Sequence, residues 1–395
     1  MAQSEPDTAN HDLFSLAGTL MKGSRHFRRE APLAKKVTTL LSKGGGLHTV
    51  CTQGDLPLRG LGMYQALLER SWSVRHDNVK EMIHLAQAAV VVARRLDKRH
   101  YRPRLIADFQ ARAWCELGNA HRAADNLGEA EHAFATAFDF FLQGTDNRHL
   151  KARLNQAYAS FLGTRRQFEP AFAALDVVCS IYIGFGNHHL IGRTLLAKAI
   201  YMHYSGQPGK ALVLNSVGRA LIDVCQDPAL DLQAALNKMW FLVACGRFRE
   251  AKKELIRNRE ALEKIEARVV FVKLRWLQGQ VFAGLGDWDQ AESALLEAKE
   301  GFESLELGLA AALASMDLAL LWMRQHRLTE CEHLVEETYQ VFVSLNIHRE
   351  AIGAFQVLNK AREKRMMTIP LLASVVEYLH RAQHNPDIPF VPKWT

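Results

Sequence analysis

The chain has 395 residues, of which 48% are hydrophobic and 23% charged, with 25 glycines and 11 prolines. These proportions are those of an ordinary globular chain, so they exclude wholesale disorder and a fibrous or low-complexity protein. The formal net charge is +7, and residues 1–104 hold the excess, with 17 Lys and Arg against 9 Asp and Glu. Such asymmetry can mark a surface for an acidic partner, although a solvated helical face also explains it.

The N-terminal segment 1–7 is polar and acidic, without the basic start and apolar run of a signal peptide. The most apolar long stretch, 308–323, is interrupted by Ser315 and Asp317 and is too short to cross a bilayer. The six cysteines are widely separated and form no Cys-x-x-Cys pair, which is typical of reduced, buried residues in a cytosolic protein. We therefore expect a cytoplasmic protein that does not bind membranes.

Residues 1–62 are predicted to be a basic N-terminal region without repeats. Glycine runs such as 44–46 interrupt any long helix, so the sequence does not predict a fold for this region. His48 and Cys51 are separated by two residues, but they make half a zinc site at best, because no second pair lies nearby. A degenerate helix pair is expected next, over 63–104.

The segment 114–137 carries a pattern that repeats later in the chain. An aromatic residue is followed by Leu117-Gly118, and a second small residue, Ala130, comes twelve positions after the glycine. This order resembles the signature of the tetratricopeptide repeat (TPR), a pair of antiparallel helices, although His121 stands where that signature has a tyrosine. The resemblance implies an all-α solenoid that binds another macromolecule.

Small residues recur with one period along most of the chain. One column lies on the second helix of each expected pair and steps by 41, 40, 40, 40 and 40 residues. It consists of Ala130, Ala171, Ala211, Ala251, Ala291 and Cys331. A second column, twelve residues earlier each time, consists of Gly118, Ala159, Ala199, Met239, Gly279 and Ala319. Two columns in phase over six units predict six helix pairs over 105–345.

The columns have a physical reason. Two helices approach to about 8–10 Å only where the side chains at their crossing are small. Gly206, Gly246 and Gly286 fall in the expected turns, where glycine ends a helix in the left-handed conformation with least strain. For one pair the pattern predicts helices over 271–284 and 288–304. Because a single pair cannot bury its apolar face alone, the pairs must stack.

The predicted fold class is therefore all-α, an α-α superhelix or TPR-like solenoid with a small non-repeat N-terminal region. Its period of 40, against the usual 34 residues, is similar to that of TPR-like regulatory and sensor proteins of bacteria. A capping helix pair is expected over 346–384, because solenoids need polar caps. An irregular tail with three prolines is expected over 385–395.

The sequence contains no catalytic motif, so we predict a protein that is not an enzyme and needs no cofactor. It lacks a glycine-rich phosphate loop, a His-Glu-x-x-His motif and a Gly-x-Ser-x-Gly nucleophile turn. Two Glu-x-x-His motifs occur, Glu81 with His84 and Glu330 with His333. In a solenoid they would lie about six repeats apart and could not share a metal ion, so no metal site is predicted.

In tetratricopeptide proteins the first helix of each pair lines a concave groove, through the second, fifth and ninth positions of the repeat. The resemblance therefore implies a partner-binding groove with a basic, polar half and an apolar half. The residues that it assigns to the groove are Arg112, Asn119, Arg153, Gln156, Arg193, Trp240, Lys273 and Trp276. Such a groove suits a peptide with an acidic end and an apolar end.

The arginine column of this groove needs an acidic counterpart. Its members Arg112, Arg153 and Arg193 would stand side by side on consecutive helices, roughly 10 Å apart. The counterpart is either the bound partner or an internal acid, and Glu116 and Asp108 are within reach by sequence.

The predicted function is that of a protein–protein interaction module, a scaffold, adaptor or regulatory subunit that binds a peptide or protein. The alternative is a nucleic-acid-associated regulator that uses its basic N-terminal region, which would make binding steeply salt-dependent. The residues assigned to that contact are Arg25, Arg28, Arg29, Lys35 and Lys36. Against the alternative, no helix-turn-helix is recognisable and aromatic residues do not alternate with the charges.

Overall fold

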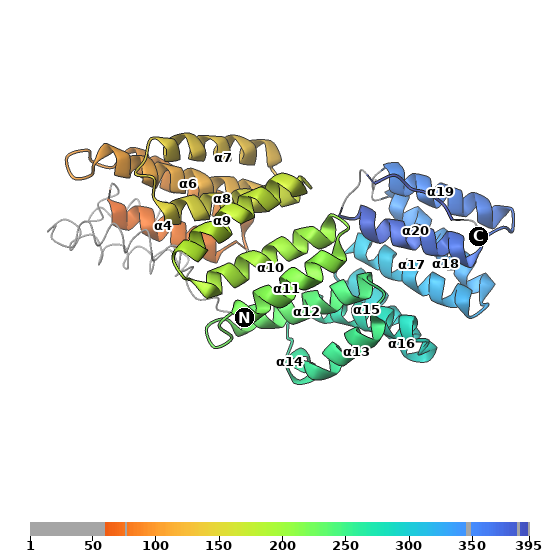
Figure 1. Ribbon diagram of the computed structural model, residues 1–395. Helices are drawn as coiled ribbons and strands as arrows, with labels where there is room; N and C mark the ends of the chain where they lie inside the picture. Colours follow the sequence, from red (N-terminus) through yellow and green to blue (C-terminus); the bar gives the residue numbers. More distant parts are fainter. Residues whose placement is uncertain (1–59, 76, 345–348, 385–387, 394–395) are drawn as a thin grey trace. The chain divides into compact units, whose positions relative to one another are not determined.

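The computed structural model describes residues 60–75, 77–344, 349–384 and 388–393 (Figure 1). Every regular element in these ranges is an α-helix, and consecutive helices pack as antiparallel pairs. The all-α, TPR-like fold class is therefore confirmed. The chain divides into two compact units, 1–194 and 195–395.

The described part of unit 1 contains three helix pairs and the start of a further helix. The pairs are α4 (Leu61–Ser73) with α5 (Val79–Arg94), α6 (Pro103–Ala123) with α7 (Leu127–Leu142), and α8 (Arg148–Thr164) with α9 (Phe168–Gly184). Helix α10 (His188–Tyr204) begins in unit 1 and ends in unit 2.

Unit 2 continues the same pattern to the end of the described chain. Its helices are α11 (Pro208–Leu221), α12 (Pro228–Ala244), α13 (Phe248–Arg257), α14 (Arg259–Glu263), α15 (Arg268–Leu285), α16 (Trp288–Ser304), α17 (Gly308–Arg324), α18 (Leu328–Ser344), α19 (Arg349–Glu363) and α20 (Ile369–Ala382). The pair predicted over 271–284 and 288–304 corresponds to α15 and α16. Helix α13, the second helix of its pair, is shorter than expected. It ends where the Asn258 side chain donates a hydrogen bond to the Glu254 carbonyl.

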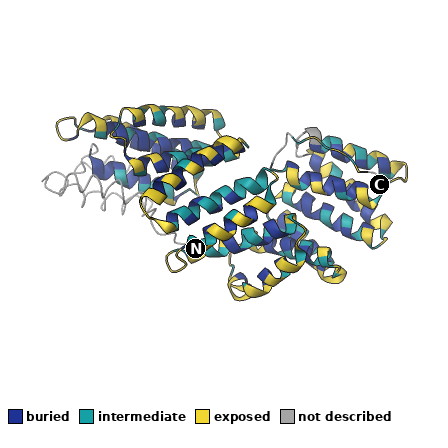
Figure 2. Ribbon diagram, viewed as in Figure 1, coloured by how far each residue is buried: buried dark blue, intermediate teal, exposed yellow. Residues whose placement is uncertain are grey.

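The predicted small-residue columns lie at the helix crossings. All six members of the second-helix column are fully buried, and so are Ala159, Ala199, Met239 and Ala319 of the first-helix column. At Gly279 a Cβ atom would stand 2.7 Å from the Leu295 side chain, closer than van der Waals contact permits. The buried faces of the helices meet along these crossings, and the exposed faces point outward (Figure 2).

The turns inside the six pairs from α6–α7 to α17–α18 share one backbone device. The last residue of each turn before the new helix donates its N–H to a carbonyl five residues earlier, as Arg247 does to Leu242 and Asp287 to Phe282. The residue before it is left-handed, with φ from 59° to 83°. These left-handed residues are Asp125, Arg166, Gly206, Gly246, Gly286 and His326. The three glycines were predicted, whereas the other three turns accept the strain of a side chain in this conformation.

Replacing Gly279 with Ala tests the helix crossing. We expect Gly279→Ala to lower the free energy of unfolding by about 1–3 kcal/mol, because its Cβ would overlap Leu295. The control is Gly353→Ala in α19, where a Cβ would meet no atom within 4 Å; better helix propensity should raise stability there by about 0.5–1 kcal/mol. Denaturant titration measures both. Equal effects at the two glycines would contradict the assigned crossing.

Candidate partner-binding surfaces

The first-helix positions of unit 1 are occupied by an internal ion-pair cluster. Arg112 on α6 and Arg153 on α8 are only 3% and 5% exposed. The Arg112 Nε lies 3.0 Å from the Glu116 carboxylate, and Arg153 donates to both oxygens of the same carboxylate at 2.9 Å. At these two positions the counter-charge of the arginine column therefore comes from within the protein. Neither guanidinium lines an open groove, which corrects the placement expected from the repeat register.

The second acid expected near the arginines has a different partner. Asp108 on α6 accepts hydrogen bonds from the backbone N–H and the hydroxyl of Thr145, in the turn before α8. Burial raises the pKa of Asp108, and these hydrogen bonds oppose the shift only in part. The Arg153 guanidinium also stacks over Trp72 of α4, 4.9 Å from the ring centre. The cluster thus joins three successive helix pairs of unit 1.

The remaining groove residues of unit 1 differ in accessibility. Asn119 is buried and accepts a hydrogen bond from Arg122 at 3.1 Å. Gln156 and Arg193 are partly exposed. Cys115, between the arginines, is buried, and burial raises the pKa of its thiol to about 12, so it does not ionise near neutral pH.

In unit 2 an aspartate organises the first-helix face. Asp317 on α17 accepts hydrogen bonds from Trp276 Nε1 at 2.7 Å and Gln280 Nε2 at 2.8 Å, and its other oxygen lies 2.9 Å from His380 Nε2. The His380 ring stacks on Trp276 with centres 5.4 Å apart. Trp240 of α12 meets Trp276 edge-on, also at 5.4 Å. His380 lies in the segment that the sequence predicted only as a polar capping helix pair, so its contact with Asp317 was not predicted.

Helix α20 closes this part of the predicted groove. It carries His380 and packs against α17, and it leaves Trp276 only 6% exposed. The α20 residues Leu371, Leu372 and Val375 are fully buried. Each such burial stabilises by about 1.5–3 kcal/mol, so α20 is an integral wall rather than a removable lid. Among the predicted residues of unit 2, Trp240 remains partly exposed and Lys273 is exposed.

Two histidines near this wall have opposite pKa shifts. Burial alone would lower the pKa of His380, but the charge of Asp317 and the hydrogen bond to it outweigh burial and raise the pKa. His203 on α10 packs against Phe241 and His384. Burial, and to a lesser degree the charge of His380, lower the pKa of His203 to about 4.

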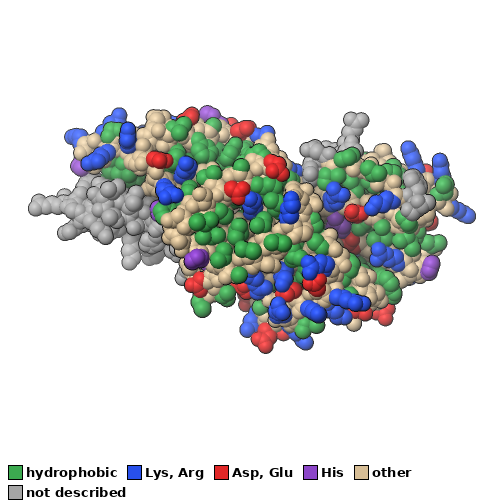
Figure 3. All heavy atoms as spheres, viewed as in Figure 1, with side chains coloured by type: hydrophobic (Ala, Val, Ile, Leu, Met, Phe, Trp, Pro, Cys, Tyr) green, Lys and Arg blue, Asp and Glu red, His purple; other side chains and the backbone are tan. Residues whose placement is uncertain are grey.

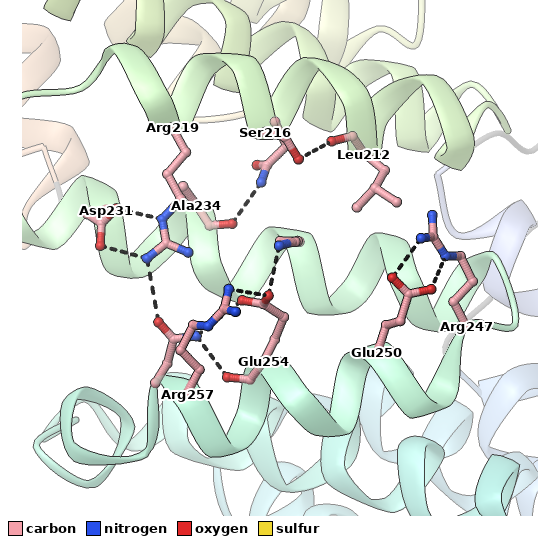
Figure 4. A network of polar contacts seen from close by, with 12 residues as sticks. Leu212, Ser216, Arg219, Asp231, Ala234, Arg247, Glu250, Glu254 and Arg257 are labelled. Atoms are coloured by element: carbon pink, nitrogen blue, oxygen red, sulfur yellow. Dashed lines mark hydrogen bonds and ion pairs between the residues drawn. The ribbon is translucent and has the colours of Figure 1, made fainter.

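A polar network pairs several charged side chains with one another where α11, α12 and α13 meet (Figure 4). Arg219 and Asp231 form a two-point ion pair at 2.6 and 2.8 Å. The buried Glu254 accepts from Lys238 at 2.8 Å and from Arg257 at 3.0 Å. On the face seen in Figure 3, acidic and basic side chains are interspersed over α13 and α14. This region is therefore held together by paired charges and offers no surface of a single sign.

Other residues singled out by the sequence have local partners or fall outside the structure. Glu81 pairs with Arg70, and His333 pairs with Glu337. The basic residues Arg25, Arg28, Arg29, Lys35 and Lys36 lie outside the described residues. No group of three or more His, Cys, Asp or Glu side chains in the described chain could hold a metal ion. None of the described helices is long and apolar enough to span a membrane.

Comparison with known proteins supports the fold. The chain is similar to the crystal structure of aspartyl phosphate phosphatase F from Bacillus subtilis, with a TM-score of 0.53 and 16% identity over 86% of this chain and 85% of that one. It is also similar to the apo form of RapI, with a TM-score of 0.52 and 10% identity over 82% and 98% of the two chains. No family model matches the chain, and no curated protein matches its sequence. At these identities the likeness establishes the fold alone.

The unit 1 ion-pair cluster can be tested by removing its acid. Glu116→Gln should lower the free energy of unfolding by about 3–5 kcal/mol, because Arg112 and Arg153 would remain buried without a counter-charge. Glu263→Gln in the exposed pair with Arg259 is the control and should have little effect. Denaturant titration at constant pH gives both values. A stable Glu116→Gln protein would show that the arginines are not held in the interior.

The two histidines predict a stability maximum near pH 6.5, the ordinary pKa of histidine. The raised pKa of His380 means that its stabilisation is complete below that pH and is lost as pH rises through the folded-state pKa. Neutral His203 behaves oppositely, and its contribution is lost as pH falls from there toward about 4. Melting temperatures measured against pH should therefore lose their high-pH decline in His380→Gln and part of their low-pH decline in His203→Phe. Unchanged profiles would contradict the assignment.

Proposed function

We propose that this chain is a non-catalytic protein–protein interaction module, a scaffold, adaptor or regulatory subunit that holds a peptide or protein against its helix pairs. The observation that supports this most is the stripe of accessible first-helix residues left beside the closed part of unit 2. It contains Trp240 and Lys273, with Gln233 also exposed on α12. Tryptophan and cations at the centre of a groove are typical of binding hot spots.

Trp240 is suited to binding because it is already held in place. Its edge-on contact with Trp276 restricts the ring, and Trp276 is itself fixed by Asp317 and His380. A side chain that is ordered before binding loses little conformational entropy when a partner covers it. The Asp317 network therefore positions a partly exposed aromatic surface and is not itself open to a partner.

The fold of the described chain is consistent with this function. Stacked helix pairs present extended faces, and such faces bind macromolecules more readily than they enclose a small substrate. The name of one similar structure denotes a phosphatase. That activity belongs to that protein, and the likeness at 16% identity concerns the fold. Arg193 and Gln156, which are partly exposed, are a separate candidate contact on unit 1.

The proposal is tested by capturing the partner with the full-length chain. Tagged protein is purified from its native cells with and without nuclease, and copurifying proteins are identified and then purified for affinity measurement. We expect a stoichiometric protein partner that resists nuclease. A complex that dissolves on nuclease treatment would instead favour the nucleic-acid alternative.

A double variant tests where on the chain the partner binds. Trp240→Ala with Lys273→Glu should weaken binding at least tenfold, since hot-spot residues of this type contribute about 2 kcal/mol or more. Lys253→Glu on α13 is the control because it reverses an exposed charge away from the stripe. Calorimetric titration compares the three proteins, with melting temperature as the check on folding. Equal affinities would rule out the first-helix stripe as the site.

A further inference from the structure

The turn between α5 and α6 carries an unusual concentration of positive charge. Residues 94–104 contain six Lys and Arg and a single acid, Asp97. Arg94, Arg95, Lys98, Arg99, Arg102 and Arg104 are all exposed. Figure 3 shows Lys and Arg side chains gathered over this turn, at the left of the view. The sequence showed the excess positive charge of the first 104 residues, but the contact residues predicted from it all lay before residue 44.

The turn is held in a defined conformation. Leu96 and Tyr101 are buried, and the Tyr101 ring packs edge-on against Phe109 of α6. The Asp97 side chain accepts from the backbone N–H of Arg99 at 2.9 Å and from its guanidinium. The cations are therefore displayed on a preorganised turn, so binding there would cost little ordering entropy.

Most of these cations have no internal counterpart. No ion pair joins Arg95, Lys98, Arg102 or Arg104 to an acid within the part of the chain that the structure describes. Two of the charges also stand where a helix least favours them, whereas Arg94 and Arg95 lie at the C-terminal end of α5, where positive charge is favourable. Arg102 and Arg104 flank the start of α6, which has no acid in its first turn, and positive charge is unfavourable at the positive end of a helix dipole.

The opposite ends of the unit 1 helices follow the usual rule. Helices α5, α7 and α9 begin at the other end of the unit, and each has a glutamate in its first turn: Glu81, Glu129 and Glu169. Helix α8 begins at the basic end and, like α6, has no acid there. The exposed cations of residues 94–104 thus lie at one end of the described part of unit 1, where an anionic partner would be stabilised.

Apolar side chains are exposed at the same end. Leu142, the last residue of α7, is 82% exposed, and Ile183 near the end of α9 is 63% exposed. The hydrogen bonds of Asp108 to Thr145 place the end of α7 beside the first turns of α6. A hollow of mixed charge, about 440 Å³, lies there too, and it is lined by Asp146, Arg148, Lys151, Asp176, Val177, Ser180 and Ile181. This end of unit 1 therefore combines cations, exposed apolar groups and a depression.

We propose that the unit 1 edge, defined by Arg95, Lys98, Arg102, Arg104, Leu142 and Ile183, docks an acidic segment of a partner protein that also carries apolar side chains. The inference rests on the proposed function, since it assigns an additional contact of the same partner. Charge complementarity selects an acidic ligand, and the exposed aliphatic side chains select a protein over a nucleic acid, because bases stack on aromatic rings. The exposed ring of Phe185, just after α9, is already stacked on His149 at 4.1 Å.

The test uses defined probes and the full-length chain. One probe is a fluorescent helical peptide of about 18 residues, with Glu on one face and Leu at helical spacing on the other. The second replaces every Leu with Ser, and the third is a single-stranded oligonucleotide of equal charge. We expect the Glu/Leu peptide to bind most tightly in fluorescence anisotropy, with affinity falling as salt rises. Equal or tighter binding of the Ser peptide or the oligonucleotide would overturn the proposal.

Two edge variants locate the binding. Arg95→Glu/Lys98→Glu/Arg104→Glu and, separately, Leu142→Ser/Ile183→Ser should each weaken peptide binding at least tenfold. The charge variant should melt no lower than the parent, because Arg104→Glu places an acid in the first turn of α6. The matched control is Arg249→Glu/Lys253→Glu/Lys264→Glu, which reverses three exposed charges of unit 2. Unchanged peptide affinity in either edge variant would refute the assignment.

The edge and the proposed function can fail independently. If the captured cellular partner binds the edge variants as tightly as the parent but loses affinity for the Trp240→Ala/Lys273→Glu variant, the edge inference fails and the proposed function stands. If the parent captures no nuclease-resistant protein, the proposed function fails whatever the peptides do. Loss of affinity in both sets of variants supports both.

Discussion

The close crossing of two antiparallel helices leaves no room for a side chain at certain positions, and the helix pairs of both units depend on this constraint. At Gly279 even a single Cβ would overlap Leu295. The alanines that follow one another along the second helices are fully buried for the same reason. Because the crossing fixes how each first helix faces its partner, it also fixes which first-helix residues point away from that partner. The accessible surfaces are consequences of this packing.

Charges in this protein are sorted by whether packing supplies a counter-charge. Arg153 and its neighbour on α6 are satisfied by one buried glutamate, and Glu254 is satisfied by two cations of adjacent helices. Those charges maintain the fold and are not available for recognition. Among the residues that the structure describes, no acid other than Asp97 pairs with the cations of the turn before α6, and these cations are directed at solvent. Binding surfaces in helical repeats are therefore better located by counting charged side chains that lack a counter-charge than by counting all charged side chains.

The C-terminal helix gives unit 2 a closed and an accessible part. Helix α20 buries its apolar residues against α17 and places His380 on Asp317 and Trp276. Trp276, in the closed part, restricts the ring of its accessible neighbour Trp240. The pKa values of the two histidines at this wall shift in opposite directions, because Asp317 favours the charged form of His380 and burial disfavours that of His203. The first-helix stripe and the unit 1 edge are then two candidate contacts, one aromatic and one electrostatic.

The sequence by itself determined the repeat, because crossings and turns are set by residues at fixed local spacing. The helices on either side of Gly286 and three left-handed glycines follow from that spacing. Tertiary structure alone decided which side chains remain accessible. Arg153 meets Glu116 across 37 positions and His380 meets Asp317 across 63, and no local period encodes such contacts. Exposure of Leu142 likewise depends on which helices pack beside it, so the accessible surfaces could be recognised only once the helices were assembled.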